Sequence, residues 1–289
     1  MSTDIAQETI NGLIVERAGD SGPAMLFVHG SSGGSWYWHG FMSYFADRGF
    51  RSYAVNLRGH GPNPPLPDLG KLSLRDYVED VRGVVDALGE VILVGHSMGG
   101  AIAQVIAQDM PLKAAVFASS APVAGVKFQN PPMNLWFALH GIKSIPAMLR
   151  KKAIKPGYRV AASSLFNCFE KEQRKELWQQ LQPESATVAV EVLRGTIDAD
   201  LSQVRCPMLC MVGTEDRTTI PAMVKEIAEY HGTAYQELPE HGHMFMIEPG
   251  WEACAQVLER WLAEHVTGGT SAVSRHASQG GLSKHERRT

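Results

Sequence analysis

The chain has 289 residues, 44% of them hydrophobic and 20% charged, with a formal net charge of −3. This composition is ordinary for a soluble globular protein, and the length allows one large α/β domain or two ordinary ones. Because basic residues are not in excess, we expect no nucleic-acid partner.

Four scattered cysteines indicate the redox environment: Cys168, Cys206, Cys210 and Cys254. They form no Cys-x-x-Cys pair and no short His/Cys cluster, so we expect reduced thiols, a cytoplasmic location and no metal site. The first residues lack a basic segment followed by an apolar one, and no apolar run reaches the length of about 20 residues that spans a bilayer. We therefore expect neither a secretory signal nor a membrane span.

The first half of the chain predicts a sheet with crossover helices. Asn11-Gly12, between two short apolar runs, predicts a type I′ hairpin over residues 9–18. Apolar runs predict buried strands over residues 24–28, 51–57, 91–96 and 113–118. Helical spacing predicts helices over residues 38–48, 74–88 and directly after Ser97. Because strands and helices alternate, we expect a parallel sheet with right-handed crossovers.

This alternation stops between residues 122 and 200, which contain six prolines and no clear buried strand. The stretch is too long for a structureless loop, so we interpret it as a helical cap inserted into the sheet domain. Its candidate helices cover residues 134–139, 144–152, 160–169, 173–181 and 185–194. A basic cluster in it is interpreted as a solvated face: Arg150, Lys151, Lys152, Lys155 and Arg159.

The sheet pattern resumes with a strand over residues 207–213 and a helix beginning at Pro221. A last strand over 234–238 and a closing helix over 251–265 follow. The predicted organisation is a core domain of residues 1–121 and 201–266, a cap of residues 122–200, and a tail of residues 267–289. The tail is rich in Gly, Ser, His and basic residues without apolar period, so we expect it to be disordered.

The segment before the third predicted helix carries the main chemical motif. An apolar run ends in Gly95-His96-Ser97-Met98-Gly99, and helix-forming residues follow. Strand, tight turn and helix form the context of a nucleophile elbow, and glycine tolerates so sharp a turn. The turn holds the serine in a strained conformation, facing the N–H groups and the positive dipole end of the next helix. Ser97 is therefore the candidate nucleophile.

A serine hydroxyl needs a base within hydrogen-bond reach, and the base needs an orienting carboxylate. On a sheet with such an elbow these partners follow later strands, in the order serine, acid, histidine. Asp216 comes just after the strand that ends at residue 213, and His243 comes just after the last strand. Both are expected at the same edge of the sheet as Ser97.

Neighbouring residues offer alternatives for both partners. Adjacent loop residues point in different directions, so only one of Asp216 and Glu215 can face the base, and we favour Asp216. We favour His243 over His241, which is assigned to the loop. Four other residues are assigned structural or surface positions. Asp198 and Asp200 precede the strand rather than follow it, His96 is expected beneath the elbow, and His29 is expected to brace its loop.

An oxyanion needs two preorganised donors. We expect them from the backbone N–H of Met98 and from the backbone N–H of Ser31 in the glycine-rich loop that follows residue 28. The Ser31 or Ser32 hydroxyl is a possible additional donor. Substrate contacts are expected from large apolar side chains beside the site or in the cap: Trp36, Trp136, Phe137 and Met244.

Together these motifs resemble the α/β-hydrolase family over residues 9–265, the cap excepted. The stretch His29–Trp36 resembles the oxyanion loop of that family, and Leu57–Gly61 resembles the segment after its fourth strand. The family commonly has Asp before that segment, where this chain has Asn56. The His-Gly-x-x-x-Gly-x-Trp pattern and the His-Met-x-Met run at 243–246 are also similar to the plant methylesterase and hydroxynitrile lyase branch.

The resemblance implies hydrolysis of small, mostly apolar carboxylic esters or lactones through an acyl-enzyme on Ser97, without metal or cofactor. Two alternatives stay open: the same triad in a hydroxynitrile lyase, carbon–carbon bond hydrolase or perhydrolase, and a small-molecule receptor on the same fold. Epoxide hydrolases and haloalkane dehalogenases are disfavoured because they need Asp at the position of Ser97. Neither the particular ester, its chain length nor the oligomeric state follows from the residues.

Overall fold

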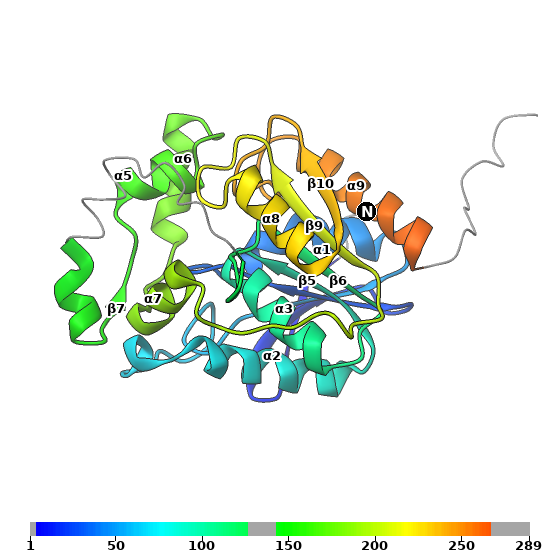
Figure 1. The fold of residues 1–289 in the computed structure, drawn as a ribbon, viewed down its shortest axis with the longest axis horizontal. Helices are drawn as coiled ribbons and strands as arrows, with labels where there is room; N and C mark the ends of the chain where they lie inside the picture. The colour runs from blue at the N-terminus through cyan, green and yellow to red at the C-terminus, as the bar shows by residue number, and fades with distance from the viewer. Residues whose placement is uncertain (1–3, 127–142, 267–289) are drawn as a thin grey trace, which may run out of the picture.

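The computed structural model describes residues 4–126 and 143–266. Its main sheet has the strand order β1-β2-β4-β3-β5-β6-β9-β10, of which Figure 1 labels β5, β6, β9 and β10. The strands are β1 (Ala6–Ile10), β2 (Leu13–Ala18), β3 (Ala24–Val28), β4 (Arg51–Val55), β5 (Val91–His96), β6 (Ala114–Ala118), β9 (Met208–Gly213) and β10 (Ala234–Leu238). Strand β2 pairs antiparallel with β1 and β4, and all other pairs are parallel. The predicted, mostly parallel α/β sheet is confirmed.

Helices cover both faces of this sheet. Helices α2 (Leu74–Leu88), α3 (Met98–Asp109) and α8 (Pro221–His231) pack on one face, and α1 (His39–Ala46) and α9 (Trp251–His265) on the other. Short 3₁₀ helices are η1 (Ser35–Trp38) and η2 (Leu69–Lys71). The fully buried strand β3 shows why two layers form: Leu26 and Val28 face the α2–α3–α8 layer, whereas Met25 and Phe27 face the α1–α9 layer.

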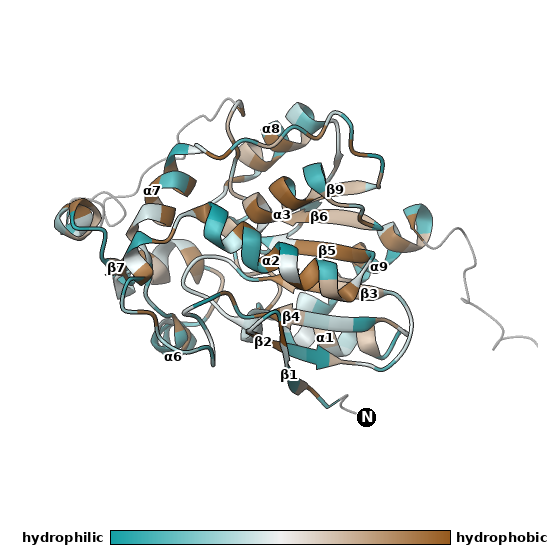
Figure 2. Cartoon of the chain, turned by 90° about the horizontal axis from the view of Figure 1, so that it is seen from below, coloured by the Kyte–Doolittle hydropathy of each residue, from teal (hydrophilic) through white to brown (hydrophobic). Residues whose placement is uncertain are grey.

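Local sequence signals account for several element ends. Asn11 and Gly12 both have positive φ, 50° and 77°, as the predicted type I′ hairpin requires. Helix α2 begins after Ser73, whose backbone N–H donates to the Asp76 side chain at 2.7 Å. Helix α8 has proline in its first turn and ends at Gly232 in the left-handed conformation. Figure 2 shows the hydrophobic residues concentrated in the central strands β3, β5 and β6.

The segment between β6 and β9, residues 122–200, is here called the insert. Its described elements lie together at one end of the sheet (Figure 1). They are a helical stretch at 143–149, β7 (Ala153–Ile154), α5 (Tyr158–Val160), the π-helical turn η3 (Ala161–Leu165), α6 (Lys171–Gln180), β8 (Glu184–Ser185) and α7 (Ala186–Arg194).

The insert also contains a short antiparallel pair, β7 and β8, which the sequence analysis did not identify. Each has two residues, too few for a hydrophobic alternation to be visible in the sequence. Four of the five predicted helices of the insert correspond to helical stretches, and the fifth, over 134–139, lies outside the described residues. The predicted disordered tail also lies outside them. The four cysteines are free thiols.

No helix within residues 4–126 and 143–266 is long and apolar enough to cross a bilayer.

Candidate active site

Ser97 occupies a strained turn between β5 and α3. Its φ of 53° and ψ of −116° lie in a region that non-glycine residues rarely adopt, at a cost of about 1–3 kcal/mol. Backbone hydrogen bonds fix the turn: Ser97 N–H donates to Ala118 O at 3.0 Å, and Ala121 N–H donates to Ser97 O at 2.9 Å. Strand β6 therefore holds the residue that the sequence predicts as nucleophile.

Two glycines allow this turn to pack closely. A Cβ at Gly95 would lie 2.1 Å from the carbonyl oxygen of Gly99. A Cβ at Gly99 would lie 2.5 Å from the carbonyl oxygen of Val28, at the end of β3. Both distances are far below van der Waals contact with atoms that cannot rotate away, so neither position accepts a side chain without displacing the backbone.

Asp216 and His243 are in direct contact although they follow different strands. Asp216 Oδ2 lies 2.9 Å from Nδ1 of His243, and both side chains are almost fully buried. The other carboxylate oxygen, Oδ1, accepts the backbone N–H groups of Thr218 and Thr219 at 2.8 and 2.9 Å. The hydroxyl of Thr219 also lies 2.9 Å from Oδ2. The carboxylate is therefore fixed on both sides.

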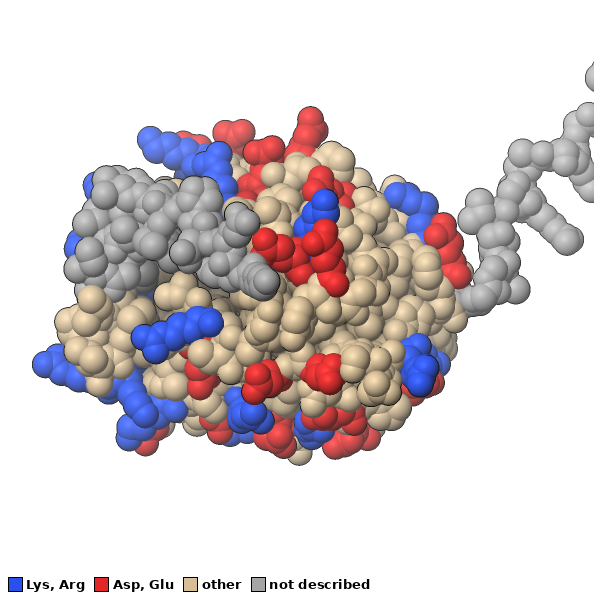
Figure 3. All heavy atoms as spheres, viewed as in Figure 1, with Lys and Arg blue, Asp and Glu red and all other residues tan. Residues whose placement is uncertain are grey.

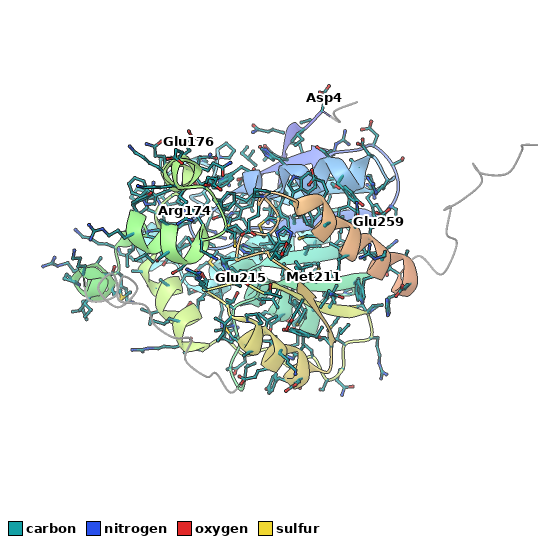
Figure 4. All side chains as sticks on the ribbon, turned by 90° about the horizontal axis from the view of Figure 1, so that it is seen from above. Asp4, Arg174, Glu176, Met211, Glu215 and Glu259 are labelled. Carbon is teal, nitrogen blue, oxygen red and sulfur yellow. The ribbon has the colours of Figure 1, made fainter. Side chains whose placement is uncertain are left out.

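The alternative acid takes no part in this contact. Glu215 is exposed, and its backbone N–H donates to the carbonyl of His241 at 2.8 Å. The carbonyl of Glu215 accepts from the Asn167 side chain of the insert at 3.0 Å. Arg174 of α6 in turn donates to the Asn167 carbonyl at 3.1 Å. Figure 4 labels Arg174 on α6 and Glu215 in the loop after β9.

The contact with Asp216 defines the tautomer of His243. Because a carboxylate only accepts, His243 carries a proton on Nδ1, which leaves the lone pair of Nε2 available. In the described part of the chain no hydrogen bond joins the Ser97 hydroxyl to Nε2. Such bonds are often long in unliganded enzymes and shorten when substrate binds. Of the three predicted catalytic residues, the structure thus shows direct contact between two, Asp216 and His243.

Two buried side chains shape the turn that carries His243. Glu248, 1% exposed, accepts from the backbone N–H of Gly242 at 2.7 Å and from that of Met244 at 3.2 Å. It also lies 3.3 Å from Nδ1 of His241, so His241 belongs to the loop. His96 Nε2 donates to the carbonyl of His243 at 2.9 Å. Burial lowers the pKa of His96, which is neutral and packed beneath the elbow as predicted.

The loop after β3 lies directly against the elbow. A Cβ at Gly30 would be 3.0 Å from Cβ of Ser97 and 2.8 Å from Nδ1 of His96. His29 braces the loop: its Nδ1 donates to Gly30 O at 2.8 Å, and its Nε2 accepts from Leu57 N–H at 3.2 Å. Burial, and then the charge of His60, lower the pKa of His29 to about 3, so this histidine is neutral.

Two backbone donors beside Ser97 have no partner. Within residues 4–126 and 143–266, neither the N–H of Ser31 nor the N–H of Met98 makes a hydrogen bond. The Met98 N–H is the first of α3, where the helix dipole is positive. The Ser31 hydroxyl is already engaged with Glu184 of the insert at 3.3 Å. The backbone group, rather than the hydroxyl, is therefore the available donor of Ser31.

The predicted substrate contacts have different environments. Trp36 is half-buried, with its ring 4.4 Å from that of Tyr37. Met244 is 1% exposed and packs in the α1–α9 layer, so it presents almost no surface to a ligand. Trp136 and Phe137 lie outside the described residues.

The basic cluster predicted in the insert is largely exposed. Arg150, Lys151, Lys152 and Arg159 are exposed, whereas Lys155 donates to the carbonyl of Gln179 at 3.2 Å. Figure 3 shows Lys and Arg side chains grouped around the end of the molecule formed by the insert.

Sequence reasoning missed several residues that hold the site. Thr219 and Glu248 fix the acid and the histidine turn, and Asn56 accepts from Ser35 N–H in the loop after β3 at 2.9 Å. The Thr-Thr pair after Asp216 has the spacing of an Asx turn, which is a usable local signal. Glu184 contacts Ser32 and Tyr77, each more than 100 residues away along the chain, and no local pattern indicates it.

The chain belongs to the alpha/beta hydrolase family, whose model matches residues 25–257. It is 40% identical over 98 residues to 2-(acetamidomethylene)succinate hydrolase of Mesorhizobium japonicum, covering 33% of each chain. It is 37% identical over 78 residues to methylesterase 18 of Arabidopsis thaliana, covering 26% of this chain and 29% of that protein. The chain thus spans a third or less of these curated relatives.

Similarity to solved structures extends over more of the chain. A thermophilic esterase from Thermogutta terrifontis, with malate bound, is 20% identical, and the match covers 90% of this chain and 98% of that chain with a TM-score of 0.65. At this identity the similarity shows the fold alone. The α/β-hydrolase fold that the motifs predict is confirmed.

Proposed function

We propose that the protein is a serine hydrolase that cleaves small carboxylic esters or lactones through an acyl-enzyme. The observation that carries this proposal is the buried 2.9 Å contact between Asp216 and His243 next to the strained turn of Ser97. A histidine held in this tautomer presents a basic Nε2, which is what activates a serine hydroxyl. The names of similar proteins, a methylesterase and an esterase, also support it.

In the acylation step, Nε2 of His243 takes the hydroxyl proton of Ser97 while the serine oxygen attacks the carbonyl carbon. The carbonyl π electrons move to oxygen, and the unpaired N–H groups of Ser31 and Met98 stabilise that negative charge. The Asp216 carboxylate stabilises the imidazolium. When the tetrahedral intermediate collapses, His243 gives its proton to the leaving alcohol, and the acyl group stays on Ser97.

Deacylation repeats these steps with water. His243 takes a proton from water, the hydroxide attacks the acyl carbon, and the same two N–H groups stabilise the second oxyanion. Collapse expels the Ser97 oxygen, which regains its proton from His243 and releases the carboxylic acid. Removing one oxyanion donor in enzymes of this kind lowers kcat by about 10² to 10³.

Two measurements on the full chain test the proposal: labelling by a fluorophosphonate probe, and turnover of p-nitrophenyl esters of increasing chain length together with a lactone panel. We expect labelling and ester turnover, and we expect Ser97→Ala to abolish both. A protein that neither reacts with the probe nor hydrolyses any ester or lactone in a Ser97-dependent way would contradict the proposal.

The panel also addresses the alternative reactions. Cyanide release from cyanohydrins, or carbon–carbon cleavage of diketones, with no ester turnover would assign the same three residues to another reaction. Tight binding of a small molecule that survives Ser97→Ala, without turnover, would indicate a receptor.

A further inference from the structure

A short segment of the insert, Gln182–Ser185, here called the strap, contacts the loop of Ser31 and Ser32. The backbone N–H of Gln182 donates to Ser32 O at 2.8 Å. The side chain of Gln182 accepts from Gly61 N–H at 2.6 Å, and the Ser185 hydroxyl donates to Leu72 O at 2.6 Å. The strap is therefore fixed to the core on both sides of Glu184.

Glu184 is the centre of this contact, and its side chain is only 3% exposed. Its two oxygens have different partners. Oε1 accepts from the Tyr77 hydroxyl and from Ser185 N–H, both at 2.7 Å. Oε2 accepts from Ser32 N–H at 3.2 Å and from the Ser31 hydroxyl at 3.3 Å. One oxygen thus connects to helix α2 and the strap, and the other connects to the loop after β3.

A buried histidine balances the charge of this carboxylate. Nε2 of His60, which is fully buried, lies 3.4 Å from Oε2 of Glu184. Burial alone would raise the pKa of Glu184, but the charge of His60 and the hydrogen bonds lower it to about 2. The charge of Glu184 likewise raises the pKa of His60 against the effect of burial. The carboxylate is thus ionised and accepts hydrogen bonds at both oxygens.

The backbone of Ser32 has an unfavourable conformation that neighbouring hydrogen bonds hold in place. Ser32 has a φ of 63°, which is unfavourable for a residue with a side chain. Its N–H points to Glu184 and its carbonyl to the strap, so the peptide units on both sides of Ser32 are fixed by the insert. The unpaired N–H of Ser31 belongs to the preceding peptide unit, whose Gly30 carbonyl accepts from His29 Nδ1 at 2.8 Å and from Gly33 N–H at 3.2 Å. Glu184 and the strap add a restraint from the other side of Ser31.

From this geometry we infer that Glu184 is a positioning residue for the oxyanion hole: it orients the backbone N–H of Ser31 by holding Ser31 and Ser32. The insert thereby takes part in turnover without Glu184 touching the substrate. This inference rests on the proposed function, because it assumes that the Ser31 N–H binds an oxyanion.

Glu184→Gln tests this role because an amide cannot accept hydrogen bonds at both of the positions that the two carboxylate oxygens occupy. An amide has one acceptor oxygen, so its NH₂ group must face either Ser32 N–H or Ser185 N–H, each of which is a donor. Since a lost oxyanion donor lowers kcat by about 10² to 10³, we expect a misaligned one to lower kcat by about 10-fold or more. We expect KM to change by less than about 3-fold, since the ground-state carbonyl depends less on this donor.

Tyr77→Phe is the matched control, because it removes a hydrogen bond from the same carboxylate but on the Oε1 side. Gln182→Ala is the control for docking of the strap, since it removes the Gly61 contact and leaves Glu184 in place. We expect both controls to keep kcat within about 3-fold of wild type, even where thermal unfolding shows a lower midpoint. The rate of fluorophosphonate labelling at Ser97 should fall in Glu184→Gln only.

Equal kcat losses in Glu184→Gln and in the two controls would overturn the inference and make Glu184 a structural residue only. If Glu184→Gln does not fold, Ser31→Ala serves instead: it removes one hydrogen bond to Glu184 and should lower kcat with KM unchanged, and an unchanged kcat would overturn the inference. A wild-type protein without Ser97-dependent turnover contradicts the proposed function itself, which separates the two failures.

Discussion

Asp216→Asn is the substitution whose effect the geometry predicts best. Oδ1 of Asp216 accepts two backbone N–H groups, those of Thr218 and Thr219, and these donors cannot rotate away. An asparagine at this position must therefore place its oxygen there and turn its NH₂ group toward Nδ1 of His243. Facing a donor, Nδ1 has to act as acceptor, so the imidazole proton moves to Nε2.

A histidine protonated on Nε2 has no lone pair for the hydroxyl of Ser97. In serine hydrolases this tautomer error lowers kcat by about 10⁴, which corresponds to about 5.4 kcal/mol of transition-state stabilisation. We expect a loss of that size in ester turnover, with KM and the circular dichroism spectrum close to wild type, because both backbone hydrogen bonds survive.

Glu215→Gln is the control, since it makes the same chemical change on the adjacent, exposed carboxylate. It should keep kcat within about 2-fold of wild type, since surface substitutions away from buried networks have small effects. An Asp216→Asn protein that retained a tenth of wild-type kcat, or a Glu215→Gln protein that lost most of it, would refute this account of how His243 is oriented.

Two further predictions concern stability. Gly99→Ala should lower the unfolding midpoint strongly and abolish probe labelling, because its Cβ would lie 2.5 Å from Val28 O. The control is Gly49→Ala, which has positive φ but no atom within 4 Å of the added Cβ, and it should lower the free energy of unfolding by only about 1–2 kcal/mol. Equal losses in the two variants would contradict the steric explanation. His29 and His96, which are buried, and His231, which is half-buried, all have lowered pKa values. Below the pKa of about 6.5 that histidine has in the unfolded chain, the unfolded chain therefore binds more protons than the folded one. The free energy of unfolding should therefore fall as the pH falls from 6.5 to 4.5, by about 1.4 kcal/mol per pH unit for a fully buried group such as His29, and His231→Gln should flatten the slope. Denaturant titrations at several pH values measure this slope, and a flat profile would contradict it.

The parts of the fold that follow local rules could be predicted from the sequence. Strand β10 and helices α2 and α9 have the predicted bounds, because alternation, capping and helical spacing are properties of adjacent residues. The place of the acid and the base after the last two strands followed from strand ends and chain order, and the favoured members of the two pairs, Asp216 and His243, are the ones in contact.

The unpredicted parts depend on residues that are far apart in sequence. Glu184 and Tyr77 are separated by 107 positions, and Glu184 and Ser32 by 152, so no periodicity connects them. The burial of Met244 could not be predicted either. Met244 packs in the α1–α9 layer, and its backbone N–H is held by Glu248, which is a tertiary contact of the His243 turn. Tertiary packing decides such features, and it leaves no local pattern.

The strap has a practical consequence for protein engineering. Inserts are natural targets for exchange when a new substrate range is wanted, because they lie between two strands and leave the sheet order unchanged. In this protein a graft that replaced residues 122–200 would also delete the carboxylate at the back of the Ser31–Ser32 loop and leave His60 buried without a counterion. A chimera therefore needs an acidic residue at the equivalent point of the donor segment, or a compensating change at His60.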